Sequence, residues 1–538
     1  MKKFIVTVAT LAFAAVVAST LASDAENSTA SNPASVEAPK GKYFKPEESV
    51  SQGSVNVNGA HVDYTTVAGT LIVHPKDWDD VPPAPGTKAD EKNPDAEASM
   101  FYVAYFKRGV AAESRPITFL FNGGPGSSTV WLHMGAFGPK RVVTANDSHT
   151  AAAPYNFINN DSSLLDASDL VFIDAPGTGF SRVAGKDKDK AFFGVDEDAH
   201  AFAEFITAFL TKHGRWNSPK YLFGESYGTT RNAALIHELE IGRSVDFNGV
   251  IMLSQILSFD MNGDSPQYNP AIDTVYQILL PTYAATAWYH HKLPGNPPDL
   301  HALLKEVQRY AMTDYGLALQ AGSVLTTAQR KAVAEKLHKY TGLPVSYILK
   351  ADLRINVGEF EKNLQGDTDT TTGRLDTRFS GPTMDPLSKE ADYDPQSASI
   401  SSAYVSAFNN YVRKDLHYGQ DKVFKPEIDI WQTWNYLHQP SGAPIPLPQA
   451  TNVIPDLSEA MKYNPNLKVM LNGGYYDLAT PFYEGIYEMR HLQIPNKLQA
   501  NIEYKYYESG HMVYANEASL KQLHDNVADF IRRTDNVN

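Results

Sequence analysis

The sequence predicts an α/β fold in which a mostly parallel central sheet carries helices on both faces and is interrupted by a large inserted cap domain. Short, continuously apolar runs alternate with amphipathic helical stretches, which is typical of parallel strands buried on both sides. This alternation stops between about 262 and 462 and then resumes. With 538 residues, the chain is long enough for a large core and an additional domain.

The strands expected in this sheet begin with a meander. From about residue 53, apolar and polar residues alternate around Asn58-Gly59 and Ala68-Gly69, a pattern typical of antiparallel strands joined by tight turns. The buried strands follow as apolar runs, each succeeded by a glycine or a helical stretch. These runs are 116–121, 170–174, 221–223, 250–253, 469–472 and 502–507, and a further strand at 100–106 precedes the first of them across a short polar turn.

Helices and loops complete the predicted architecture. The stretches 196–214 and 517–533 have apolar residues at helical spacing. Within the insertion, the turn-rich stretch 366–383 is expected to be an exposed polar loop. The first part of the core, the inserted cap domain and the second part of the core are predicted at 48–261, 262–462 and 463–538.

The N-terminal residues 1–22 have the layout of a secretory signal peptide. Two lysines precede an apolar run that is short for a membrane span, and small residues follow it. We expect cleavage near Ala22, then a flexible leader over 23–47. No later stretch is long and apolar enough to cross a bilayer, so no membrane insertion is expected after cleavage. The lysine-containing start and the absence of disulfides favour a bacterial protein that is periplasmic or secreted.

The composition excludes several classes of function. The chain has no cysteine, which rules out disulfides, thiolate metal sites and a cysteine nucleophile. A formal net charge of -14 argues against nucleic acid or an anionic membrane surface as a partner. No histidines stand at a metal-ligand spacing, so we predict no metal site and no cofactor. The composition says nothing about the oligomeric state.

A short glycine-containing turn, 224–228, follows one of the buried strands and reads "GESYG". It matches the G-x-S-x-G nucleophile elbow of α/β-hydrolases, in which a serine stands on a strained corner between strand and helix. Glycines flank such a serine because a Cβ would clash with neighbouring backbone. A glycine-rich turn without a catalytic role is the alternative. The elbow predicts Ser226 as a nucleophile and the α/β-hydrolase fold as the form of the sheet.

Three further segments supply what an acyl-transfer serine requires, namely backbone donors, a carboxylate and a base. The loop 122–126, "NGGPG", directly follows the strand 116–121 and can bring backbone N–H groups close to a ligand. Asp477 and His511 each follow a later core strand, in the order that α/β-hydrolases use. An ordinary turn is the alternative for the loop, and an Asx turn is the alternative for Asp477.

Together these segments resemble the serine carboxypeptidase family, particularly its bacterial members. The resemblance extends over about 50–260 and 465–535 and does not include the cap. The segments that match the family's motifs are "NGGPG" (122–126), "GP" (138–139), "DAPGTGFS" (174–181), "GESYG" (224–228), "NGGYYDLATP" (472–481) and "SGHMV" (509–513).

The resemblance implies a role for each matching residue of the catalytic centre. Ser226 is the nucleophile, His511 the general acid and base, and Asp477 the carboxylate that orients the histidine. The backbone N–H groups of Gly124 and Tyr227 form the oxyanion hole.

The resemblance also implies a site for the terminal carboxylate of the substrate, formed by Asn122, the Gly123 amide and Glu225. Glu225 can donate to a carboxylate only when it is protonated, and burial should raise its pKa. The chain departs from the family nearby: Ala136 stands where a second glutamate is usual, and Arg231 replaces a tyrosine. Arg231 could supply a cation to the carboxylate, or it could be a structural ion-pair partner.

The sequence therefore predicts an exported serine carboxypeptidase that hydrolyses C-terminal residues from peptides through an acyl-enzyme on Ser226. Its expected partners are peptide substrates with a free C-terminus. Two alternatives stay open: an esterase or acyltransferase that uses the same triad, and a non-catalytic peptide-binding protein on a hydrolase fold.

Overall fold

The computed structural model describes residues 42–80 and 93–537. The predicted signal peptide and most of the predicted leader lie outside the described residues. The end of that leader is not flexible as expected, because the backbone N–H groups of Tyr43 and Phe44 donate to the Glu97 carboxylate at 3.1 and 2.8 Å. No helix in the described ranges is long and apolar enough to cross a membrane.

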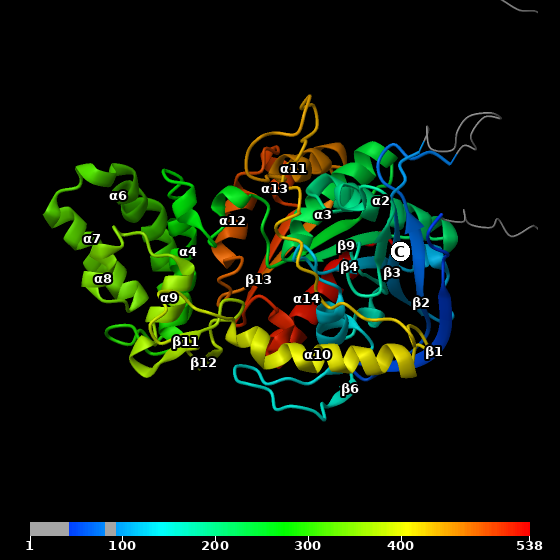
Figure 1. The fold of residues 1–538 in the computed structure, drawn as a ribbon, viewed down its shortest axis with the longest axis horizontal. Coiled ribbons are helices and arrows are strands. Elements are labelled where there is room, and N and C mark those ends of the chain that lie inside the picture. Colours follow the sequence, from blue (N-terminus) through cyan, green and yellow to red (C-terminus); the bar gives the residue numbers. More distant parts are fainter. Residues whose placement is uncertain (1–41, 81–92, 538) are drawn as a thin grey trace, which may run out of the picture. The chain divides into compact units, whose positions relative to one another are not determined.

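A ten-stranded sheet forms the centre of the described chain (Figure 1). Its strands are β1 (Glu48–Val57), β2 (Ala60–Val73), β3 (Glu97–Lys107), β4 (Ile117–Phe121), β7 (Asp169–Ile173), β8 (Arg182–Ala184), β9 (Lys220–Glu225), β10 (Gly249–Leu253), β13 (Lys468–Gly474) and β14 (Ile502–Tyr507).

The strand order is β1-β2-β3-β7-β4-β9-β10-β13-β14, and β8 pairs with β3. Strands β1 to β3 are antiparallel, as the alternating pattern predicted. The neighbouring strands β7, β4, β9, β10, β13 and β14 are parallel to one another, as the continuous apolar runs predicted. The loops that follow β4, β9, β10, β13 and β14 therefore meet at one edge of the sheet, where ligands bind in open α/β sheets.

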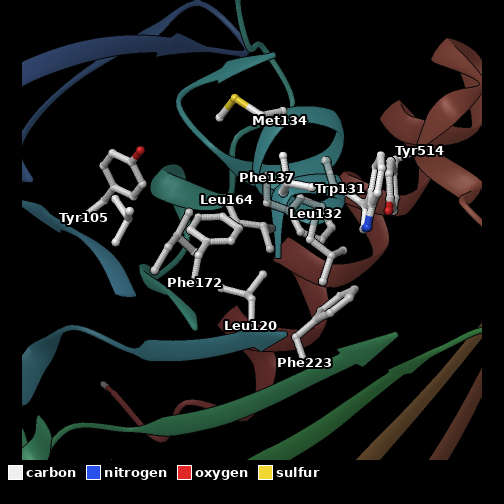
Figure 2. Packing of buried hydrophobic residues seen from close by; sticks show 14 of the residues in the cluster. Tyr105, Leu120, Trp131, Leu132, Met134, Phe137, Leu164, Phe172, Phe223 and Tyr514 are labelled. Atoms are coloured by element: carbon white, nitrogen blue, oxygen red, sulfur yellow. The ribbon is translucent and has the colours of Figure 1, made fainter. Parts of the chain in front are cut away.

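Helices bury both faces of the sheet, which confirms the predicted α/β class. On one face, α2 (Val195–Lys212), α3 (Tyr227–His237) and α11 (Ile454–Tyr463) pack against Phe119 and Leu222. On the other, α14 (Glu517–Thr534) and a π-helical turn over Leu132–Phe137 pack against Leu120 and Phe223. Figure 2 shows Leu120 and Phe223 pointing from the strands towards this second layer.

Shorter elements lie around the core. Two strands, β5 and β6, pair in a small antiparallel sheet of their own. These elements are β5 (Lys140–Val142), β6 (Phe157–Asn159), α1 (Lys188–Phe192), α12 (Phe482–Arg490) and α13 (Asn496–Gln499).

The chain between β10 and β13, which we call the insertion (residues 254–467), adds no strand to the main sheet among its described residues. Its first helices share a hydrophobic cluster of their own, whereas α10 packs on the core cluster. The elements are α4 (Thr274–Tyr289), α5 (Leu300–Tyr310), α6 (Gly316–Ala321), α7 (Thr327–Thr341), α8 (Val345–Lys350), α9 (Val357–Asn363), β11 (Thr370–Thr372), β12 (Ser380–Pro382), α10 (Pro395–Lys414) and α11, which packs on the sheet as described above.

The turn-rich stretch 366–383 is exposed at its two ends, over 366–369 and at 380 and 382, but most of its middle is buried, contrary to the exposed loop that its composition predicts. Thr372, Asp376, Thr377 and Phe379 are all fully buried. The Asp376 carboxylate pairs with Arg378, and the Thr372 and Thr377 hydroxyls bond to Gln365 and Thr286, so this part of the stretch can be buried despite its polarity.

Candidate active site

The turn between β9 and α3 has the geometry of a nucleophile elbow. Ser226 stands between the last residue of β9, Glu225, and the first of α3, Tyr227, with φ 61° and ψ -131°. A positive φ is strained for a residue with a Cβ and is typical of functional corners. At Gly224 an added Cβ would lie only 2.1 Å from the carbonyl oxygen of Gly228, so this position requires glycine. The strain singles out Ser226 as the residue that the turn presents.

Asp477 and His511 are joined by a hydrogen bond, although 34 positions separate them. Each follows a strand, β13 and β14 respectively, and the parallel pairing of these strands brings the two loops together. His511 Nδ1 lies 2.8 Å from Asp477 Oδ2. The Asx turn that was the alternative for Asp477 is also present, because its Oδ1 accepts from the Ala479 N–H at 2.9 Å. The Thr480 N–H and hydroxyl donate to Oδ1 and Oδ2, at 3.0 and 2.8 Å, and these bonds fix the carboxylate beside the histidine.

The charge of the histidine is set by two opposing effects. Burial is the largest single effect and lowers the pKa of His511, as does the Arg374 charge, whereas the charge of the Asp477 carboxylate and its hydrogen bond to the ring raise the pKa. The ionised Glu225 carboxyl raises it further. The net result is a pKa above the ordinary value, so the site stabilises the imidazolium that forms when the ring accepts a proton.

Seven of the eight predicted site residues line one cavity of about 340 Å³. Asp477 is not in its wall but contacts His511 from behind. The elbow and the glycine loop touch closely, since a Cβ on Gly123 would lie 2.4 Å from the Tyr227 nitrogen. The predicted residues in the wall are Asn122, Gly123, Gly124, Glu225, Ser226, Tyr227 and His511.

Glu225 is a buried carboxyl in the wall of this cavity, with 2% of its surface exposed. The Tyr514 hydroxyl donates to both of its oxygens, at 3.1 and 2.9 Å, and Asn122 contributes a further side-chain hydrogen bond. Burial raises the pKa of Glu225 to about 7, with the Asp477 charge adding to the rise and His511 opposing it. The carboxyl is therefore largely protonated in mildly acidic solution.

Arg231 lies beneath the cavity and is not among its lining residues. It is 1% exposed and forms a bidentate ion pair with Asp198, at 2.6 and 3.2 Å. Its Nη1 also donates to the carbonyl oxygen of Asn122 at 2.8 Å. Of the two roles left open for Arg231, the structure supports the structural ion pair, which holds the glycine loop against α3.

The family model described as "Serine carboxypeptidase" matches residues 91–523 of the chain. The chain belongs to the serine carboxypeptidase family. It is 31% identical over 141 residues to the pheromone-processing carboxypeptidase KEX1 of Phytophthora infestans, which is 24% of this chain and 21% of that protein. It is 26% identical over 159 residues to serine carboxypeptidase-like 9 of Arabidopsis thaliana, which is 29% of this chain and 35% of that relative.

The matched segments thus span about a fifth to a third of the length of these curated relatives. Among solved structures, the chain is similar to Kex1ΔP, a prohormone-processing carboxypeptidase from Saccharomyces cerevisiae, with a TM-score of 0.50 and 16% identity. That similarity covers 87% of this chain and 91% of the yeast chain. It confirms the α/β-hydrolase type of the fold.

In this member of the serine carboxypeptidase family, the insertion contributes part of the cavity wall through residues that could not be named from the sequence. Arg374 lines the cavity and is paired with Asp264, also of the insertion. Glu427 lines it too, where residues 426–428 run antiparallel to the glycine loop: Ser128 N donates to Pro426 O at 2.9 Å. No motif marks these residues, because they reach the site only through the three-dimensional fold.

Tyr514, the partner of Glu225, was also missed, although its position three residues after His511 gave a local signal. In residues 42–80 and 93–537 no group of three or more potential ligand side chains could hold a metal ion.

Proposed function

We propose that this chain is an exported serine carboxypeptidase that removes C-terminal residues from peptides through an acyl-enzyme formed on Ser226. The observation that carries the proposal is the buried, readily protonated carboxyl of Glu225 directly beside the strained Ser226 in one cavity. A buried neutral carboxyl is suited to donate a hydrogen bond to a second carboxylate. Such a group next to a nucleophile favours substrates that end in a free carboxylate.

In the proposed complex, the terminal carboxylate of the peptide binds to Asn122, the Gly123 amide and protonated Glu225. This places the last peptide carbonyl at Ser226, with its oxygen directed to the amides of Gly124 and Tyr227. The amides donate to the oxyanion that develops during attack and thereby lower the barrier.

The reaction then proceeds in two steps through the triad. His511 accepts the hydroxyl proton of Ser226 while the serine oxygen bonds to the carbonyl carbon, and Asp477 stabilises the imidazolium. The imidazolium returns the proton to the leaving nitrogen, the peptide bond breaks, and the terminal residue departs as a free amino acid. Water then attacks the acyl-enzyme, giving its proton to His511, and Ser226 is released with a proton regained from the same ring.

We further propose that residues 262–462 of the insertion act as a cap domain over the cavity. The support for this is that Asp264, Arg374 and Glu427 line the cavity together with the core loops. Export rests on the sequence alone, through the signal peptide expected at 1–22. N-terminal sequencing of the mature protein, expected to begin just after Ala22, tests it.

The central test is labelling with a fluorophosphonate, followed by peptide degradation. Wild-type protein should react with the probe, and Ser226→Ala should not. A mixed peptide library should lose residues one at a time from the C-terminus, as seen by mass spectrometry. Labelling without loss of terminal residues, combined with turnover of esters, would favour the esterase or acyltransferase alternative. Absence of labelling would favour the peptide-binding alternative.

A further inference from the structure

A short segment of the insertion, Arg374–Arg378, lies between the two core loops that carry Asp477 and His511. We call it the RLDTR segment after its sequence. Three backbone hydrogen bonds join it to these loops. They run from Leu478 N to Arg374 O (3.0 Å), from Thr377 N to Tyr476 O (2.9 Å) and from His511 N to Leu375 O (2.6 Å).

Two side chains of the segment form hydrogen bonds to residues 508–510, which directly precede His511. Asp376, which is fully buried, accepts from the Gly510 N–H at 3.1 Å and pairs with Arg378 at 2.6 and 3.0 Å. Arg378 donates to the carbonyl oxygen of Glu508 at 3.0 Å and to the Ser509 hydroxyl at 3.2 Å. One ion pair thus contacts three consecutive residues that lead into His511.

The fit between the segment and the histidine loop is tight. A Cβ on Gly510 would lie 2.4 Å from both the Asp376 Cβ and the Leu375 carbonyl oxygen. Because Gly510 has no side chain, its backbone can lie in contact with the backbone of the RLDTR segment.

The segment is itself fixed from the side of the insertion. The Asp394 carboxylate, at the start of α10, accepts from the backbone N–H groups of Arg374 and Leu375, at 2.7 and 3.2 Å. Thr377 is held by Thr286 of α4 through a hydroxyl–hydroxyl contact of 2.7 Å. The histidine loop is therefore tied to two helices of the insertion and not only to its own strand, β14.

We propose that the Asp376–Arg378 pair positions His511 for catalysis. The insertion would then support the catalytic histidine in addition to covering the cavity. This inference rests on the proposed function of Ser226 and His511. Neither member of the pair touches the reacting atoms; both act through the backbone that carries the histidine. Geometry matters at this level because a displacement of about 1 Å at a catalytic group can cost about 100-fold in rate.

The test is Asp376→Asn, a change of similar shape that removes the ion pair. We expect kcat to fall about 10- to 100-fold while KM stays within about twofold, because the residue does not contact the substrate. The fluorophosphonate labelling rate should fall in parallel. The downfield proton signal of the hydrogen bond between His511 and Asp477 should shift or broaden in the NMR spectrum. Arg378→Lys keeps the charge but loses the fork of donors, and should show a smaller effect of the same kind.

Asp169→Asn is the matched control. Asp169 is 3% exposed and pairs with Arg115 and Arg215, at 3.0 and 2.6 Å, but it does not line the cavity. Both Asp variants remove one partner of a buried ion pair, so both should be destabilised. At a temperature where each is folded, only Asp376→Asn should lose kcat and change the histidine signal.

Equal losses in the two variants, or an unchanged histidine signal in folded Asp376→Asn, would overturn the proposal. If Asp376→Asn does not fold, the same comparison is made with Arg378→Lys, and an unchanged signal there has the same meaning. Failure of the proposed function has a different signature: wild-type protein that does not react with the fluorophosphonate. In that case the NMR signal still decides whether the pair positions His511.

Discussion

Replacing Glu225 with glutamine should change how activity depends on pH, and this tests the proposed carboxylate site directly. In the wild type, His511 must be neutral to accept the serine proton, while Glu225 must be protonated to donate to the substrate. With the pKa of Glu225 raised to about 7, its protonated fraction falls about tenfold for each pH unit above that value. We therefore expect a bell-shaped profile of kcat/KM on peptides with a free C-terminus, with its alkaline limb set by Glu225.

The size of the effect follows from the same pKa. At about pH 9, roughly one Glu225 carboxyl in 100 is protonated, so kcat/KM should be down about 100-fold from that cause alone. The amide of glutamine donates at every pH, and Glu225→Gln should lose this alkaline limb. At about pH 6 the variant should be about fivefold slower, because a neutral donor replaces a carboxylic acid and forms a bond weaker by about 1 kcal/mol.

The assay is kcat/KM across pH for the wild type and the variant, on matched peptides with free and amidated C-termini. The amidated peptide has no terminal carboxylate, so its binding does not require a proton on Glu225. The alkaline limb of its kcat/KM profile should therefore be absent in both proteins. Identical alkaline profiles for both peptides in the wild type would refute the role of Glu225. The triad would be unaffected by that result.

Three other predictions follow from the geometry of the site. Ser226→Ala and His511→Ala should each lower kcat by about 10⁴-fold or more, and the double variant should cost little beyond either; losses that multiply in single-turnover assays would mean that one residue is misassigned. Arg231→Gln leaves Asp198 buried and unpaired, so urea unfolding should show a loss of about 3–5 kcal/mol, and a loss under 1 kcal/mol would contradict the structural ion pair. The raised pKa of Glu225 means that the folded state holds its proton more tightly than the unfolded chain. Glu225 should therefore contribute a decline of about 3 kcal/mol in stability as pH rises from 4.5 to about 7, and in denaturant titrations at successive pH values the decline should be smaller by about that amount in Glu225→Gln.

The core, and the juxtaposition of the three candidate triad residues, could be predicted because their signals are local. Each buried parallel strand is a short apolar run, and each triad residue follows such a run within a few positions. Parallel pairing then brings the ends of β9, β13 and β14 to one edge of the sheet, so that three local signals become one site. Ser226, Asp477 and His511 were found in this way, without any knowledge of the insertion.

The role of Arg231 could not be settled from the sequence because its partner is distant in the chain. Asp198 stands 33 positions earlier, on α2, and the two charges meet only when α2 and α3 pack side by side. A charged residue looks exposed in a sequence until its partner is known, since burial of an ion requires a partner of opposite charge.

The same reason explains why the burial of the middle of the stretch 366–383 was not predicted. Its threonines, aspartates and glycines are typical of exposed turns, and composition alone predicts a solvated loop. In the structure, Asp376 and Arg378 neutralise each other, and their remaining donors and acceptors bind the loop before His511. Polar residues that satisfy one another can be buried, and neither hydrophobic periodicity nor turn propensity reports such pairing.

The insertion contacts the loops of the candidate site from two sides. The family motifs alone therefore do not determine the geometry of the site. On one side the RLDTR segment binds the loops of Asp477 and His511; on the other, Pro426 accepts a backbone hydrogen bond from the glycine loop at Ser128. The motifs identify which residues stand at the site. Their exact positions also depend on an insertion that carries none of those motifs. Because the insertion contacts the loop before His511 and lines the cavity, we expect substitutions in the insertion to change the activity of this chain even where every motif residue is kept.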